Sequence, residues 1–210
     1  MPADRLIIHP PTETLGQVRE WIVQNTPQHC VVQVDDDFTG VRPRIGLRRK
    51  KLIDPVAITS ILVSGYQICN DLGLSAFYYA PNPNPSAFSP MEPIKLTAPM
   101  CGVFGILGKR LHFDKSLIHG EDCDFLMKVL LRDRVAYCDD RVCFDTGGMM
   151  HIPGGLQAMR TDAIMKNDVA KLKDRWGPHL LIQKKSHNYG KRVESDTIHI
   201  VVPRKRQAGL

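Results

Sequence analysis

The chain has 210 residues, enough for one sizeable α/β domain with or without a trailing subdomain, and its 43% hydrophobic and 24% charged residues are typical of a globular protein. No run approaches the ~18 apolar residues of a membrane helix, and no signal-peptide pattern opens the chain. Six scattered cysteines without a C-x-x-C pair favour free thiols over a disulfide framework. We therefore expect a cytoplasmic protein without a membrane partner, and its net charge of +6 points toward polyanions.

The first half of the chain predicts strand, helix, strand, helix and strand over residues 5–11, 14–26, 30–34, 54–73 and 74–80. The first helix has apolar residues at helical spacing, a threonine N-cap at Thr12 or Thr14, and an end before Pro27. The second helix has Asp54 as its N-cap, Pro55 at its first position and Gly73 at its end. The last strand completes a strand–helix–strand alternation.

The second half continues the alternation after a proline-rich loop over 81–93, of the size that usually covers or lines a site. It predicts strands within 101–113, 135–145, 179–185 and 197–202, helices over 120–133 and 163–177, and a glycine-bounded loop over 147–155. Alternating strands and helices predict an α/β sheet, whose ligands bind beyond the carboxyl ends of the strands.

Three basic segments stand out from the rest of the chain. Residues 42–51 hold six basic side chains and no acid, and further basic residues gather over 184–192 and 203–207. A short run of charge is usually a solvated surface. Three such segments in one small chain favour a polyanionic partner, with nucleic acid first. The candidate phosphate contacts of the first segment are Arg42, Arg44, Arg48, Arg49, Lys50 and Lys51.

The segment "VVQVDDDF" places three carboxylates where a predicted strand ends. Asp35 and Asp37 are two residues apart, so in an extended chain they project to the same side and can share a hard divalent cation, Mg²⁺ or Mn²⁺, with nucleotide phosphates completing its coordination. The alternative is an acidic turn before Gly40. The D-x-D pattern by itself leaves both interpretations open.

A second acidic cluster, "GEDCDF", lies at the predicted start of a helix. Glu121, Asp122 and Asp124 suit the free N–H groups of a helix N-terminus, and one of them suits a general base toward an acceptor hydroxyl. The two roles are compatible. His151 and His187 lie in glycine-containing segments, and a neutral imidazole from either is a candidate late metal ligand, although a single histidine is commonly an ordinary surface residue.

Taken in this order, the motifs resemble the GT-A-fold glycosyltransferases that use nucleotide sugars. "VVQVDDDF" is similar to the D-x-D element of that family, and "FDKSLIHGEDCDFLMKVL" is similar to its xED element with the preceding acceptor-side strand. More narrowly, "FDTGGMMHIPGG", "KLKDRWG" and "KSHNYGKR" resemble the TET/JBP-associated glycosyltransferases of phages and base-J-making protists, which glycosylate hydroxymethylated pyrimidines in DNA. The general resemblance covers roughly residues 15–190.

The resemblance implies a GT-A, Rossmann-like mixed sheet flanked by helices. It implies one domain over 1–190, followed by a C-terminal strand and basic tail over 191–210. Fewer than forty residues precede the aspartate triplet, so we expect either an abbreviated nucleotide-gripping start or a truncated gene, and in the given sequence "RLIIHPPTETLG" alone would recognise the donor base. If the gene is a phage gene, the compartment is the host cytoplasm.

The resemblance also assigns roles to residues. Asp35 and Asp37 would hold Mn²⁺ or Mg²⁺ on the diphosphate of a UDP-sugar, with Asp36 adjacent and Lys191, in the second basic segment, near the donor phosphates. Asp122 would deprotonate the acceptor hydroxyl, while Glu121 and Asp124 orient the acceptor or the sugar. His151 or His187 would supply the C-terminal metal ligand. The implied acceptor is a 5-hydroxymethylpyrimidine in DNA.

Three alternative functions stay open at this point. The same fold can serve a glycan, protein or small-molecule acceptor, which would remove the salt-sensitive DNA binding. The chain can be a non-catalytic nucleic-acid-binding module whose acidic clusters are turns and caps. Paired carboxylates at a strand end also suit a metal-dependent nuclease.

Overall fold

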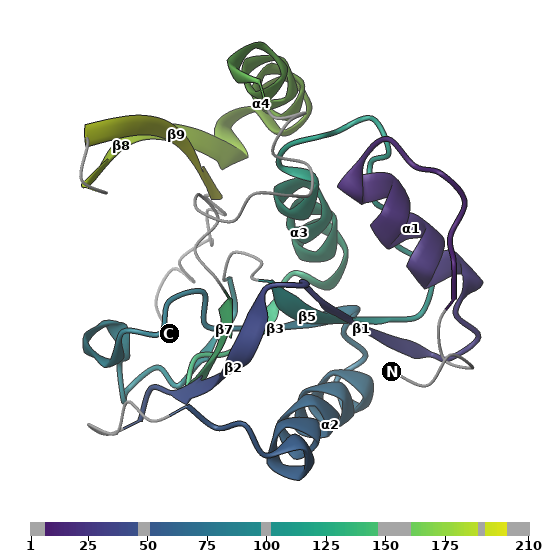
Figure 1. The fold of residues 1–210 in the computed structure, drawn as a ribbon, viewed down its shortest axis with the longest axis vertical. Coiled ribbons are helices and arrows are strands. Elements are labelled where there is room, and N and C mark those ends of the chain that lie inside the picture. Colours follow the sequence, from purple (N-terminus) through teal and green to yellow (C-terminus); the bar gives the residue numbers. More distant parts are fainter. Residues whose placement is uncertain (1–6, 46–50, 98–101, 147–160, 189–191, 201–210) are drawn as a thin grey trace, which may run out of the picture.

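The computed structural model describes residues 7–45, 51–97, 102–146, 161–188 and 192–200 (Figure 1). The elements in chain order are α1 (Leu15–Asn25), β1 (Cys30–Val34), β2 (Phe38–Pro43), α2 (Pro55–Asp71), β3 (Ala76–Tyr79), β4 (Ile94–Lys95), β5 (Val103–Leu107), α3 (Glu121–Asp133), β6 (Tyr137–Asp139), β7 (Val142–Thr146), α4 (Asp162–Trp176), β8 (Leu180–Asn188) and β9 (Arg192–Ile200). Short 3₁₀ turns lie at Pro85–Ala87 and Gly177–His179.

A mixed sheet of five strands in the order β1-β5-β3-β6-β4 forms the centre of the molecule. β3 and β6 are parallel, β5 is antiparallel to both β1 and β3, and β4 is antiparallel to β6. β1, β3 and β6 therefore run in the same direction, and their carboxyl ends lie at one edge of the sheet. The prediction of an α/β fold with a mixed sheet flanked by helices is confirmed.

The two faces of this sheet carry different cores, because successive side chains of a strand point to opposite faces. On one face Tyr78 and Phe104 pack with Val23 of α1 and Phe125 of α3. On the other, Phe77 and its neighbours pack under α2. Gly105 makes room for the Phe77 ring, which would lie 2.0 Å from a Cβ at that position. Figure 1 shows α1 and α3 on one side of the sheet and α2 on the other.

The structure confirms the predicted helices. The sequence predicts them well because the signals at their ends are local. Thr14 accepts a hydrogen bond from the Gln17 N–H, and Asp54 accepts from the N–H groups of Val56 and Ala57. Pro55 opens α2, and Gly73 follows its end with φ +67°. Gly177, at φ +53°, likewise ends α4. Each cap satisfies helix-end groups that have no partner within the helix.

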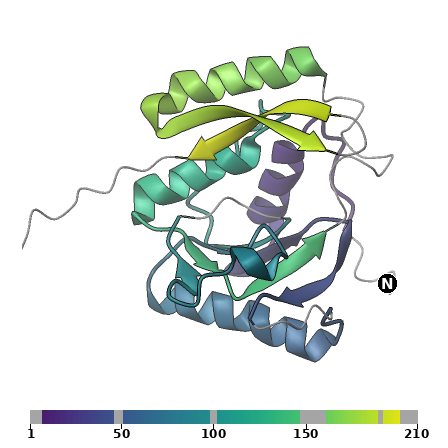
Figure 2. The same ribbon diagram turned by 90° about the vertical axis from the view of Figure 1, so that its left-hand side faces the viewer.

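Two smaller units stand beside the main sheet. β2 pairs with β7 in an antiparallel ribbon, and β8 pairs with β9 along the whole length of both strands. α4 packs on the hairpin through Leu172, Leu180 and Ile198, together with Leu117 from the loop before α3. Figure 2 shows the resulting layers, with α4 and the hairpin above α3 and the main sheet between α3 and α2.

The structure departs from the sequence predictions at several places. Residues 7–11 of the predicted strand over 5–11 form no strand, and Ile7 and Ile8 are exposed. β2 was not predicted, because Gly40 and Pro43 interrupt a strand pattern whose partner, β7, lies about a hundred residues away. The predicted boundary after residue 190 falls between β8 and β9, which form one hairpin.

Arg44 lies in the interior, although the sequence placed it among the nucleic-acid contacts. Its side chain is 2% exposed and pairs with Asp140, which is fully buried. Asp140 also pairs with Lys95 at 2.9 Å, and the Arg44 guanidinium lies 6.0 Å from the Phe88 ring centroid. A side chain this deeply buried offers no group to a phosphate, so we correct the assignment: Arg44 is a structural residue.

This burial predicts unequal effects for two arginines of the same basic segment. We expect Arg44→Met to lower the free energy of unfolding by about 3–5 kcal/mol, because Asp140 loses one of its cations in a dry environment. Arg42→Ala, at a partly exposed pair with Asp145, should lower it by about 1 kcal/mol or less. Urea unfolding followed by circular dichroism measures both, and equal losses would contradict the structural role of Arg44.

Candidate active site

The aspartate triplet lies where the chain leaves the main sheet and enters the ribbon. The Asp35 N–H donates to the Gly102 carbonyl at 2.8 Å, and the Asp35 carbonyl accepts from the Phe38 N–H at 3.2 Å. Asp36 and Asp37 form the turn between β1 and β2. Asp35 and Asp37 are half-buried, while Asp36 is exposed. The triplet therefore stands at the carboxyl end of β1, as the sequence predicts, with its backbone held on both sides.

The second acidic cluster opens α3. Gly120 precedes it at φ +78°, and a Cβ there would lie 2.7 Å from Leu172 Cδ1 of α4. A glycine is therefore required at this position both by its backbone conformation and by the close approach of α4. Glu121 and Asp124 are buried, and Asp122 is half-buried. Carboxylates in this first turn also interact favourably with the helix dipole.

Arg19 of α1 joins the two clusters. Its Nη2 lies 3.1 Å from Asp35 Oδ1, and its Nη1 lies 3.5 Å from Glu121 Oε1. The Arg19 and Glu121 side chains are 8% and 5% exposed, against 41% for Asp35. The Arg19 guanidinium also lies 5.1 Å from the Phe104 ring centroid. Segments that are 86 residues apart in the sequence thus meet at one buried cation.

Arg19 was missed because the sequence reading followed only apolar residues. The apolar residues at helical spacing in the first helix are Leu15, Val18, Trp21 and Ile22, whereas the buried positions are Gly16, Arg19, Glu20 and Val23. The buried positions 16, 19, 20 and 23 follow helical spacing, and Arg19 and Glu20 are charged residues among them. That pattern is the signal in the sequence that could have indicated Arg19. Glu20 is used structurally, since it accepts from the Phe113 N–H at 2.9 Å and lies 2.7 Å from His112 Nδ1.

The electrostatics of Asp35 reflect this crowding. Burial raises the pKa of the Asp35 carboxyl above its ordinary value, and the neighbouring charges of Asp37 and Asp36 act in the same direction. The Arg19 guanidinium opposes them through its charge and its hydrogen bond. The end of β1 is therefore a place where negative charge is concentrated and a cation is favoured.

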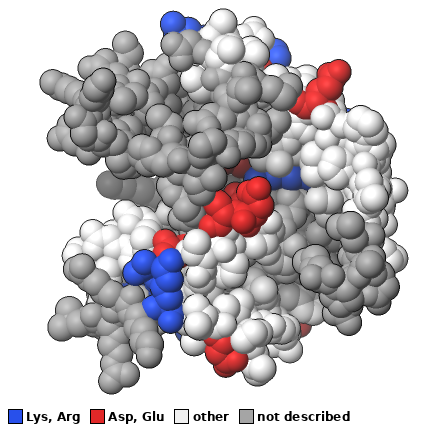
Figure 3. Space-filling view, in the orientation of Figure 1, with Lys and Arg blue, Asp and Glu red and all other residues white. Residues whose placement is uncertain are grey.

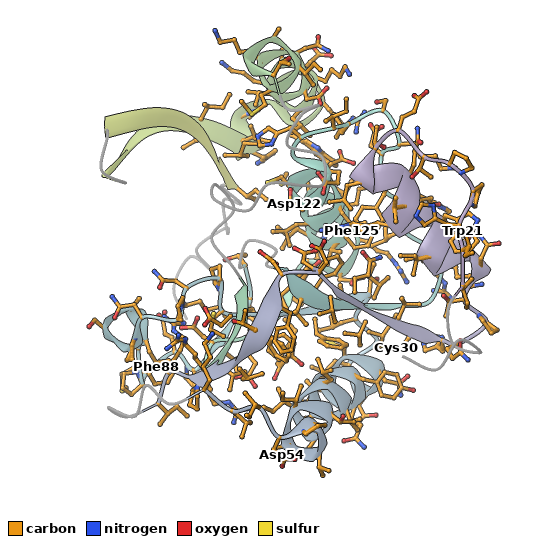
Figure 4. The ribbon with its side chains drawn as sticks, in the orientation of Figure 1. Trp21, Cys30, Asp54, Phe88, Asp122 and Phe125 are labelled. Atoms are coloured by element: carbon orange, nitrogen blue, oxygen red, sulfur yellow. The ribbon has the colours of Figure 1, made fainter. Side chains whose placement is uncertain are left out.

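Asp122 is the most accessible carboxylate of the α3 cluster. Its Oδ1 accepts from the Cys123 N–H at 2.8 Å, and burial together with the charge and a side-chain hydrogen bond of Asp122 raises the pKa of the Cys123 thiol. Figure 4 shows Asp122 at the N-terminal end of α3, one turn before Phe125. Phe125 stacks on Phe113 with ring centroids 4.3 Å apart, so aromatic side chains of the core pack below this turn. Half-buried at the helix start, Asp122 is therefore the carboxylate of this cluster that a bound molecule reaches most easily.

Asp124 points away from this accessible side and into the contact between α3 and α4. Its Oδ1 accepts from Arg175 Nη1 at 2.7 Å and from Trp176 Nε1 at 3.0 Å, and its Oδ2 lies 2.7 Å from Lys128 Nζ. The Asp124 side chain is fully buried. The sequence assigned Asp124 to the acceptor or the sugar, whereas the structure places it in the attachment of α4 to α3.

Asp168 of α4 makes a second attachment. Its Oδ2 accepts from the N–H groups of Ile118 and His119 at 2.8 and 3.1 Å, and its Oδ1 lies 3.0 Å from Lys171 Nζ. These bonds hold the loop that leads into Gly120 and the α3 cluster. α4 therefore acts on the site indirectly, by setting the position of the turn that carries Asp122.

The basic residues of the 42–51 segment fall into three groups. Arg42 Nε and Lys51 Nζ both pair with Asp145 Oδ2, at 2.7 and 2.9 Å, and they lower the pKa of Asp145 against the opposing effect of burial. Two cations on one carboxylate leave a net positive surface. Arg44 is buried, as described above. Arg48, Arg49 and Lys50 lie outside the described residues.

The remaining predicted ligands are not placed. His151 and Lys191 lie outside the described residues, and His187 belongs to β8 although its side chain is not described. Within the described ranges there is no cluster of three or more His, Cys, Asp or Glu side chains that could hold a metal ion. The described donors are thus two half-buried carboxylates, Asp35 and Asp37. Such a set fits Mg²⁺ or Mn²⁺ that keeps further oxygen ligands from water or a diphosphate.

The surface agrees with this arrangement. In Figure 3 acidic side chains gather near the centre of the face, over the junction of β1 and β2 and the start of α3, and a basic group lies below them on the side of the ribbon.

No helix of the described chain is both long enough and apolar enough to span a membrane. The five cysteines in the described ranges are free thiols, as predicted.

Comparisons with known proteins give no family for this chain. It matches no protein-family model, and neither the curated proteins nor the solved structures show significant similarity to it. The functional argument therefore depends on the chemistry of the site itself.

The attachment of α4 predicts an acid-sensitive component of stability. Arg175 Nη2 pairs with Asp114 Oδ2 at 2.6 Å, and although burial opposes the shift, the hydrogen bonds of Ser116 and Arg175 lower the pKa of Asp114 from 3.8 to about 2. Because the folded pKa is the lower one, this stabilisation is complete above pH ~4 and is lost as the pH falls toward 2. We expect Asp114→Asn to flatten the dependence of the melting temperature on pH in that window. An unchanged dependence would contradict the role of Asp114.

Proposed function

We propose that this protein is a metal-dependent glycosyltransferase with a GT-A-like fold, which transfers a sugar from a UDP-sugar to the hydroxyl group of a 5-hydroxymethylpyrimidine in DNA. The observation that carries the proposal is the meeting of Asp35 and Glu121 at Arg19. It brings a D-x-D segment and a G-E-D segment into one site. A site with a seat for a cation and, beside it, an accessible carboxylate is what such a transfer requires.

The donor side of the reaction needs negative charge to be neutralised. When the bond between the anomeric carbon and the diphosphate oxygen breaks, a nucleoside diphosphate leaves with the bonding electrons. Asp35 and Asp37 would hold Mn²⁺ or Mg²⁺, which supplies Lewis-acid stabilisation of this leaving group. The exposed Asp36 lies beside them. The raised pKa of Asp35 and its neighbouring like charges support a cation at this position.

The acceptor side needs a base. Asp122 takes the proton of the acceptor hydroxyl while the oxygen of that hydroxyl forms the new bond to the anomeric carbon. The helix start holds Asp122 Oδ1 through the Cys123 N–H, and the half-buried carboxylate is the one of this cluster that an acceptor would reach. Glu121 positions this turn through Arg19, and Asp124 positions it through Arg175 and Trp176. We therefore assign substrate contact to Asp122 and a positioning role to Glu121 and Asp124.

DNA as the acceptor is supported by the charge of the ribbon. Arg42 and Lys51 lie on the part of the chain that leads away from the triplet, and together they exceed the charge of Asp145. A target base in a duplex has to be turned out of the stack to reach a site of this kind. The phosphates beside such a base would contact this surface.

The direct test incubates the protein with Mn²⁺, hydroxymethylated DNA and a panel of UDP-sugars, and then measures the mass of the released nucleosides. We expect a hexose mass gain with one donor. Asp122→Asn and Asp37→Asn should each lower the rate by about 10²-fold or more, since one removes the base and the other a cation ligand. Asp71→Asn, at the exposed end of α2, is the matched control and should leave the rate unchanged.

Each contrary outcome points to a different function. Sugar transfer to a glycan, protein or small molecule, without transfer to DNA, would keep the transferase and replace the acceptor. DNA cleavage without a sugar donor would indicate a nuclease. DNA binding with no transfer, unaffected by Asp35→Ala and Asp122→Asn, would indicate a binding module.

The DNA surface is tested separately by salt dependence. The logarithm of the DNA association constant falls as the logarithm of the salt concentration rises. If Arg42 and Lys51 each contact a phosphate, the double variant Arg42→Ala/Lys51→Ala should make this negative slope less steep by about 2. Lys166→Ala/Lys173→Ala removes the same charge from exposed positions on α4 and should change the slope little. Fluorescence anisotropy with a labelled duplex over a series of salt concentrations measures both. Equal slopes for the two double variants would exclude the ribbon as the DNA contact.

A further inference from the structure

Arg19 brings a permanent positive charge into the site that the proposed function assigns to a divalent cation. Its guanidinium is almost completely buried between Asp35 and Glu121 and packs on the Phe104 ring. An arginine stays protonated at all pH values at which proteins fold. Its charge therefore acts on Asp35 whether or not a metal ion is bound.

The backbone of Asp35 is also held by bonds that do not involve the Arg19 side chain. Backbone hydrogen bonds hold Asp35 to Gly102 and to Phe38. α1 is held against β1 by a different bond, in which Gln33 Nε2 donates to the carbonyl of Arg19 at 3.4 Å. A substitution of the Arg19 side chain keeps all three bonds. Such a substitution removes one positive charge and its contacts with Asp35 and Glu121, while the backbone around Asp35 keeps its bonds.

A cation bound by Asp35 would lie within a few ångströms of this guanidinium. The two positive charges repel each other, and both use the negative charge of the same carboxylate. We propose that Arg19 is the internal counter-ion of the site: it offsets part of the negative charge of Asp35 and Glu121 in the absence of a divalent cation and weakens the binding of that cation. The bare ion then binds loosely and binds firmly together with a nucleoside diphosphate, whose negative charge offsets that of Arg19. This inference rests on the proposed function for the identity of the diphosphate.

Titration calorimetry with Mn²⁺ alone tests the counter-ion. We expect Arg19→Gln to bind Mn²⁺ about tenfold more tightly than the wild type, and Arg19→Lys, which keeps the charge, to bind within about twofold of it. Arg132→Gln removes the same charge from the far end of α3, where Arg132 contacts Ser75 Oγ, and should bind as the wild type does. Addition of UDP should tighten Mn²⁺ binding more in the wild type than in Arg19→Gln. Equal or weaker Mn²⁺ binding by folded Arg19→Gln would overturn the proposal.

A second pair of variants keeps Arg19 and serves if Arg19→Gln does not fold. Glu121→Gln and Asp122→Asn remove one negative charge from adjacent residues, but Glu121 is the one that shares the guanidinium. Glu121→Gln leaves Arg19 to Asp35 alone, so we expect it to weaken Mn²⁺ binding at least threefold more than Asp122→Asn. An equal loss in the two variants would overturn the proposal.

The Mn²⁺ titration needs no donor or acceptor, so its outcome is separate from that of the transfer assay. Tighter binding by Arg19→Gln without any sugar transfer by the wild type would keep the counter-ion and end the transferase proposal. Sugar transfer by the wild type with unchanged Mn²⁺ affinity in Arg19→Gln would keep the transferase proposal and end the counter-ion. Absence of saturable Mn²⁺ binding in every variant, up to millimolar concentration, would overturn the counter-ion.

Discussion

The contact of one buried guanidinium with two carboxylates is the constraint around which the site is organised. Arg19, Asp35 and Glu121 come from α1, the end of β1 and the start of α3. Removing such charges from water is costly, and their mutual attraction offsets that cost only while all partners are present. The three elements are therefore committed to one arrangement. Any cation or substrate that enters the site meets charges that are already oriented.

The layer of α4 and the β8–β9 hairpin extends this constraint to the outer side of α3. Asp168 fixes the loop before Gly120, and Asp124 receives Arg175 and Trp176. The turn that presents Asp122 is thus held from the sheet side by Arg19 and from the outer side by α4. A carboxylate that is held from two sides loses little orientational freedom when a ligand binds, which is the advantage of a site built on rigid elements.

The elements that the sequence predicted well are those whose signals are local. Asp54 and Pro55 mark the start of α2, and Gly73 and Gly177 mark helix ends, because caps are decided within a few residues. Of the strand predicted over 5–11, the described residues 7–11 form no strand, because Ile7 and Ile8 pair with no sheet there. β2 was missed for the complementary reason, since its partner β7 lies far along the chain. Arg44 looked like its basic neighbours, and nothing near it in the sequence indicates Asp140 as its partner.

The sequence by itself determined the alternation of helices and strands, the placement of the aspartate triplet at a strand end, and the acidic start of α3. Each of these follows from side-chain periodicity or from capping chemistry over a short window. Only the tertiary structure decided that the triplet and the α3 cluster share a buried arginine, that Asp124 faces α4 rather than the accessible side, and that Arg44 is buried while Arg42 and Lys51 lie nearer the surface. Burial and ion pairing depend on which distant segments meet, and that is settled by packing rather than by local sequence.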